Sequence, residues 1–138
     1  MNTFNLIESI LKVKNDELSN MQKIISMCNQ TQPRKMDMET YTYMTGLVDG
    51  IKDSICTLEC MFYRKKELKD YDKLLHSIKS DVETSNSILE HMNKRKIEYE
   101  EKGNHIMIYY IYGQIEAKEQ EEQTLEMILT THKESKNE

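Results

Sequence analysis

Two cysteines in the middle of the chain are the residues best placed to do chemistry together. Cys56 and Cys60 lie four residues apart, so on a helix their sulfurs would project from the same side, one turn apart. A metal site would need two further ligands, and neither a Cys-x-x-Cys pair nor a nearby pair of histidines supplies them. We therefore predict that Cys56 and Cys60, like Cys28, are small buried hydrophobic residues rather than metal or redox ligands.

The four histidines do not form a catalytic or metal-binding motif either. A helical bundle that holds two metal ions normally carries Glu-x-x-His on two of its helices, and no histidine of this chain follows a glutamate at that spacing. The four glycines never cluster as a phosphate-binding loop requires. The sequence thus predicts a protein that is not an enzyme and has no catalytic residue, no metal site and no cofactor.

Composition limits the fold class and the kinds of partner. The 138 residues have the length of one domain, and four glycines with one proline are too few for a fold rich in turns, so we expect an all-α protein. A net charge of −5 makes nucleic acid an unfavourable partner. No apolar run could cross a membrane, no signal peptide is evident, and three cysteines suit a reducing compartment. We expect a cytoplasmic protein.

A stripe of apolar residues at steps of three and four predicts a first helix over residues 3–28. The stripe consists of Phe4, Ile7, Leu11, Leu18, Met21, Ile25 and Cys28. The polar tract after it contains Pro33, which lacks an amide proton and restricts the residue before it to extended conformations. We therefore predict a turn at Pro33.

The region 37–102 contains no proline and has no glycine after Gly50. Its apolar stripe changes phase between Phe62 and Leu68, which indicates either a local change of winding in one long helix or a break near residues 63–67. We favour one long helix because no residue that breaks helices is present. Gly46 and Gly50 share one face, and each costs helix stability, so we expect a neighbouring helix to approach closely there.

Gly103 suits the end of that helix, and residues 105–112 are the most apolar and aromatic stretch of the chain. Such a stretch also fits a strand, but a single strand would have nothing to pair with, so we predict a third helix over 105–132. The acidic, glutamine-rich segment 116–123 is expected to be an exposed helical surface.

The whole prediction is one domain over 1–132, an antiparallel helical hairpin or three-helix bundle with a long coiled-coil-like central helix. Residues 133–138 form a frayed polar tail, and no internal repeat longer than the heptad is evident.

Two clusters of tyrosine and methionine are candidate surfaces for contact with a partner, because these side chains offer large, adaptable contact areas. They comprise Tyr41, Tyr43, Met44, Met107, Tyr109, Tyr110 and Tyr112. The alternative is that the apolar members are simply core residues. Tyr43 and Tyr109 fall off the apolar stripes, so we expect these two to be exposed.

These features predict a non-catalytic helical module that binds another protein. It could serve as an adaptor, an assembly or stalk component, or a virus-encoded inhibitor of a host protein. The long helix would extend beyond what a helix of residues 3–28 can cover, which leaves apolar surface for self-association in a homo-oligomer. The alternative function is a helical bundle that binds a small ligand in a pocket lined by Tyr109, Tyr110, His105 and the thiols.

Overall fold

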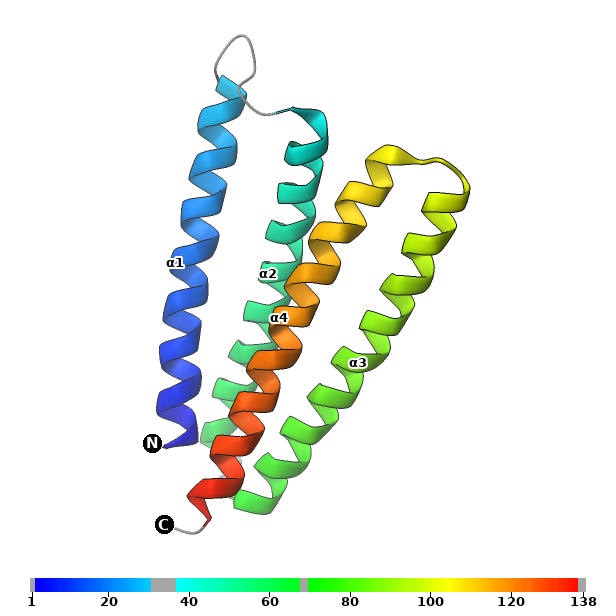
Figure 1. The fold of residues 1–138 in the computed structure, drawn as a ribbon. Coiled ribbons are helices and arrows are strands. Elements are labelled where there is room, and N and C mark those ends of the chain that lie inside the picture. The colour runs from blue at the N-terminus through cyan, green and yellow to red at the C-terminus, as the bar shows by residue number, and fades with distance from the viewer. Residues whose placement is uncertain (1, 31–36, 68–69, 137–138) are drawn as a thin grey trace.

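The computed structural model describes residues 2–30, 37–67 and 70–136, and these residues form four helices and no strand. The helices are α1 (Thr3–Gln30), α2 (Met38–Glu67), α3 (Tyr71–Glu101) and α4 (His105–Ser135) (Figure 1). The all-α prediction is confirmed, and the stretch at 105–112 is helix rather than strand. The turn predicted at Pro33 lies outside the described residues.

The four helices form two antiparallel hairpins, α1–α2 and α3–α4. The hairpins pack against each other through α2 and α4. Successive helices run in opposite directions, so α2 and α4 are parallel, and both chain termini lie at the same end of the bundle (Figure 1). α1 packs mainly on α2, and α3 mainly on α4, while α2 and α4 pack most extensively on each other. Among the described residues, α1 and α3 make no contact with each other. The arrangement therefore has four helices instead of the two or three predicted.

The single helix predicted over 37–102 is wrong, because α2 ends at Glu67 and α3 begins at Tyr71. Asp70 caps the new helix, since its Oδ1 accepts a hydrogen bond of 2.9 Å from the amide of Asp72. The change of phase in the apolar stripe coincides with this break. At the far end of α3, Gly103 adopts a φ of +66°, the left-handed conformation that commonly follows a helix.

The backbones of α2 and α4 touch near the start of both helices. A Cβ atom added to Gly46 would lie 2.1 Å from the carbonyl oxygen of Tyr110, and one added to Gly113 would lie 2.2 Å from the carbonyl oxygen of Tyr43. One turn further on, a Cβ at Gly50 would lie 2.4 Å from the Cβ of Ala117. Any side chain at the first two positions would force the helices apart.

The contacts between α2 and α4 are reciprocal, and the two helices share a sequence pattern. Both read Tyr-x-x-Gly-x-x-acid-small, at residues 43–50 and 110–117. Both are also capped alike, with Asp37 accepting from the amide of Thr40 at 2.7 Å and Asn104 from that of Met107 at 3.3 Å. Equivalent positions lie 67 residues apart, since 110 − 43 = 67 and 104 − 37 = 67. The hairpins are thus related by an approximate two-fold axis, a repeat that our sequence analysis missed.

The apolar core is divided along the bundle. At the end that carries the termini, all four helices contribute to one cluster, which consists of Ile7, Leu58, Met61, Leu74, Ile78, Val82, Leu125 and Ile128. Further along, Ile51, Ile55 and Ala117 form a second cluster, against which Leu11 and Leu18 of α1 pack. The second cluster is therefore confined to the α1 side of the α2–α4 pair.

His132 ties three helices together at the end of the bundle that carries the termini. Its Nε2 lies 3.0 Å from the carbonyl oxygen of Tyr71, and its Nδ1 lies 2.9 Å from Oγ1 of Thr3. A carbonyl oxygen can only accept, so Nε2 carries the proton of the neutral ring, and Nδ1 accepts from Thr3. The imidazole also stacks on the ring of Tyr71, with 4.2 Å between the ring centroids.

We predict that Gly46→Ala destabilises the protein, although alanine is the better helix former by about 1 kcal/mol. The new Cβ would collide with backbone, which cannot move aside as a side chain can, so we expect a net loss of about 2 kcal/mol or more. Urea unfolding followed by circular dichroism measures this difference. Ser87→Ala, on the exposed surface of α3, is the control and should change stability little. A stabilised Gly46→Ala protein would contradict the close helix contact.

Candidate functional site

The predicted interface residues all lie near the N-terminal ends of α2 and α4. Because these helices are parallel, the two clusters predicted from the sequence come together at one end of the bundle (Figure 1). The half-buried members are Tyr41, Tyr43, Met44, Met107, Tyr109 and Tyr110, and Tyr112 is exposed. Tyr43 and Tyr109 are therefore less exposed than the sequence predicted.

Two of these tyrosines join α2 to α4 on either side of the glycine contact. The Tyr110 hydroxyl donates to Oδ2 of Asp49 at 2.6 Å, and the Tyr43 hydroxyl donates to the carboxylate of Glu116. Burial, together with the bond to Glu116, raises the pKa of Tyr43 to about 12. The bond to Asp49, together with burial, raises the pKa of Tyr110 to about 12. Both phenols are therefore protonated donors at neutral pH, and their polar ends are occupied within the chain.

A shallow depression of about 220 Å³ lies where the first turns of α2 and α4 meet. It is lined by Met38, Glu39, Thr42, His105, Ile106 and Tyr109, and the three residues from each helix occupy equivalent positions about the two-fold axis. The depression includes His105 and Tyr109 of the predicted ligand pocket, but Tyr110 and the thiols do not line it. The carboxylate of Glu39 raises the pKa of Tyr109 at its edge.

Exposed apolar side chains concentrate at the end of the bundle that carries this depression. Six of the ten exposed large apolar side chains in the described residues lie within two turns of this end of the bundle. They are Ile24, Met27, Met38, Ile97, Ile106 and Tyr112. Met27 is 67% exposed and Ile106 is 62% exposed. We call this set, together with the depression, the apolar end.

The cysteines do not lie where the sequence predicted. Cys56 and Cys60 are exposed on α2, and Cys28 is partly buried. The prediction of burial is wrong for the first two, because the core-facing side of α2 is formed by Ile51, Ile55 and Leu58, with which neither cysteine is in phase. Within the described residues, no three histidine, cysteine or acidic side chains are grouped so that they could hold a metal ion. None of the described helices is long and apolar enough to span a membrane.

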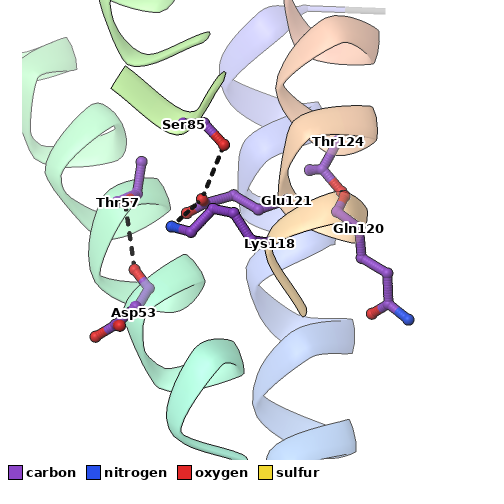
Figure 2. A network of polar contacts seen from close by, with 7 residues as sticks. All are labelled: Asp53, Thr57, Ser85, Lys118, Gln120, Glu121 and Thr124. Carbon is purple, nitrogen blue, oxygen red and sulfur yellow. Dashed lines mark hydrogen bonds and ion pairs between the residues drawn. The ribbon is translucent and has the colours of Figure 1, made fainter. Parts of the chain in front are cut away.

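A polar network lies buried between α3 and α4 in the middle of the bundle (Figure 2). Nζ of Lys118 lies 2.5 Å from Oε2 of Glu121, and Oγ of Ser85 donates to the same oxygen at 3.3 Å. The side chains of Lys118 and Glu121 are only 7% and 3% exposed. The other carboxylate oxygen of Glu121, Oε1, is buried and has no hydrogen-bond partner among the described residues.

The network was missed because segment 116–123 looks like an exposed surface in the sequence. The approximate two-fold axis provides the signal that could have found it. Lys118 corresponds to Ile51 and Ser85 corresponds to Leu18, since each pair is 67 residues apart. Ile51 and Leu18 belong to the apolar cluster on the α1 side. Glu121 corresponds to Ser54, which is also buried and polar. The charged pair is thus found in one hairpin and not at the equivalent positions of the other.

Comparison with known proteins adds no relative to this description. No protein-family model, no curated protein and no solved structure matches the chain.

We predict that Tyr110→Phe costs about 1.5 kcal/mol of stability at neutral pH, because it leaves half-buried Asp49 without its donor. Tyr43→Phe should cost less, since Glu116 is exposed and water replaces the phenol. Because the pKa values of Tyr43 and Tyr110 are raised, the stabilisation that their hydrogen bonds give is complete below pH 10 and is lost as the pH rises towards 12. Wild-type stability, measured by urea unfolding from pH 7 to 11, should therefore fall more steeply than that of either variant. Tyr63→Phe, at an exposed position, should behave like the wild type.

We predict that Glu121→Leu alone is far more damaging than the double change Lys118→Met/Glu121→Leu. The single change buries an ammonium group without its carboxylate, which costs about 3–5 kcal/mol, whereas removing both charges is often neutral or stabilising. The equivalent pair on the α1 side, Ile51 and Ser54, is also buried and carries no charge. Urea unfolding of the three proteins tests this. A double variant that is as unstable as the single one would show that the fold requires the ion pair.

Proposed function

We propose that this chain is a non-catalytic protein-interaction module that binds a partner protein, and a second copy of itself, through the apolar end. The observation that carries the proposal is the concentration of exposed apolar side chains at the end of the bundle where α2 and α4 begin. Apolar surface of this kind is stabilised when a partner removes it from water. An adaptor, an assembly component and an inhibitor of another protein would all act in this way.

The argument for self-association differs from the one that the sequence suggested. A long central helix with an uncovered apolar stretch was expected, but α4 packs against both α2 and α3 and covers them. The surface available to a partner is therefore the end of the bundle rather than the side of one helix. Ile106 lines the depression at this end and is 62% exposed.

A small apolar ligand is the second candidate, and the depression itself is the observation that favours it. It contains His105 and Tyr109 of the pocket that the alternative predicted, but not Tyr110 or the thiols. Its volume of about 220 Å³ is smaller than the roughly 300–1,000 Å³ of most small-molecule sites. A protein side chain inserted into the depression fits this volume better than a complete ligand of ordinary size does.

We predict that Ile106→Asp weakens association at least about tenfold, because it places a charge where an apolar side chain would be buried. Light scattering over a range of protein concentrations measures self-association, and a pull-down from the native host with both proteins tests for another partner. Met127→Asp is the matched control, since Met127 lies on α4 away from the apolar end and is 47% exposed. It should associate like the wild type.

Circular dichroism melting of both variants shows whether the fold is retained. A wild-type protein that stays monomeric, and captures no protein in a manner that depends on Ile106, would overturn the proposal. A ligand-induced rise in melting temperature that Ile106→Asp abolishes would then favour the small-ligand alternative.

A further inference from the structure

We propose that the small cavity beside the buried network is a binding site for water, and that the bound water links Glu121 to Asp81. The cavity has a volume of about 50 Å³ and lies among α2, α3 and α4. It is lined by Thr57, Asp81, Thr84, Ser85, Ile88, Lys118 and Glu121. About 10–15 Å³ is enough for one water molecule, so the space is sufficient.

The balance of donors and acceptors around the cavity selects water as the ligand. Oε1 of Glu121 is buried and needs a donor. Lys118 has three ammonium protons, one of which goes to Glu121 in the described structure, so it can still donate to an acceptor. A bound cation could satisfy Glu121 but would repel Lys118. Water can donate to the first group and accept from the second.

The hydroxyls that line the cavity are also suited to water. Ser85 donates its proton to Glu121, and Thr57 donates its own to the carbonyl oxygen of Asp53 at 3.2 Å (Figure 2). Each hydroxyl oxygen can still accept a hydrogen bond. The second proton of a water molecule bound to Glu121 therefore has acceptors within the same cavity, including the carboxylate of Asp81.

Asp81 is the ionisable group in the cavity whose titration reports on its link to Glu121. It is half-buried on α3 and meets charged groups from both helices packed against it. From α2, Nη1 of Arg64 lies 3.9 Å from Oδ2 of Asp81. From α4, Lys118 and Glu121 share its cavity. On its outer side, Asp72, Lys73 and His76 of α3 line an open groove together with Asp81 and Arg64.

These surroundings have opposite effects on the Asp81 carboxyl. Burial raises its pKa above the ordinary 3.8, Arg64 lowers it, and Glu121 raises it further, and the net direction is upward. The folded protein therefore holds this proton at a pH where the unfolded chain has lost it. The stabilisation that the proton gives is present below pH 3.8 and is lost as the pH rises through the pKa of the folded state.

The two-fold relationship shows which part of this site is particular to the α3 side. On the α1 side, Lys118 is replaced by Ile51, which belongs to an apolar cluster, and Glu121 is replaced by the buried Ser54. A buried ion pair is frequently less stabilising than apolar side chains of similar size. The charged pair of the α3 side thus has no counterpart at the equivalent positions of the α1 side.

Titration of the Asp81 side-chain carboxyl carbon by NMR, on the full chain labelled with carbon-13, tests the proposal. The midpoint in the wild type should lie above pH 3.8. It should move down in Glu121→Gln, which removes a negative charge, and up in Arg64→Gln, which removes a positive one. Glu126→Gln removes the same charge from an exposed site on α4 and should leave the midpoint unchanged.

The water is tested by a high-resolution crystal structure, in which an ordered water molecule should lie within hydrogen-bond distance of Oε1 of Glu121. A wild-type midpoint at or below pH 3.8 would overturn the link between Asp81 and Glu121, and this measurement does not depend on any variant folding. A Glu121 carboxylate whose two oxygens are both satisfied by protein groups, with no water beside it, would overturn the water site.

Discussion

The close contact of α2 and α4 at Gly46 and Gly113 is the constraint on which the rest of the structure depends. Two helices whose backbones touch lie nearer than helices that pack through ordinary side chains, which are usually separated by about 8–10 Å. The four helices therefore form a flattened arrangement, with α2 and α4 in contact and α1 and α3 held apart on the outside. A core shared by all four helices remains at the end that carries the termini.

The same contact explains where the tyrosines lie and what they do. It brings Tyr43 near Glu116 and Tyr110 near Asp49, so each helix supplies one donor and one acceptor to the other. These bonds lie on the two sides of the contact and fix the rotation of one helix relative to the other. Parallel packing also places the first turns of α2 and α4 side by side, which creates the depression between them. The depression is thus a consequence of the glycine contact.

Sequence periodicity was sufficient to predict the helices, because a stripe at steps of three and four reports directly which face of a helix is covered. It could not show the break before α3, since a single capping residue, Asp70, starts the new helix and no glycine or proline precedes it. The exposure of Cys56 and Cys60 was missed because either cysteine can occupy a core or a surface position at little cost.

The repeat was missed for a different reason. Its signal lies in a few positions, Tyr43, Gly46 and Asp49 with their equivalents, and these make contacts between helices that are distant in the sequence. The long apolar stripes around them differ between the hairpins. Analysis of local sequence patterns detects long stripes and does not detect a few separated positions. A close helix contact could therefore be predicted at Gly46, but Gly113 could not be predicted as its partner.

The structure also changes which residues are suited to meet a partner. The sequence favoured tyrosines, whose hydroxyls would give a partner directional hydrogen bonds, but the hydroxyls of Tyr43, Tyr110 and Tyr112 are bonded to carboxylates of the chain itself. The apolar side chains at this end are therefore better suited to meet a partner than the tyrosine hydroxyls, and Ile106 and Met27 are the most exposed of them.

The two helix N-termini at this end would attract an anionic group if their amides were unsatisfied. Asp37 and Asn104 cap them, and the carboxylate of Asp37 opposes a further negative charge. An apolar side chain presented by a partner therefore matches this surface better than a charged one. Recognition of such a side chain would depend on the shape of the depression. That shape depends in turn on how closely Gly46 and Gly113 allow α2 and α4 to approach.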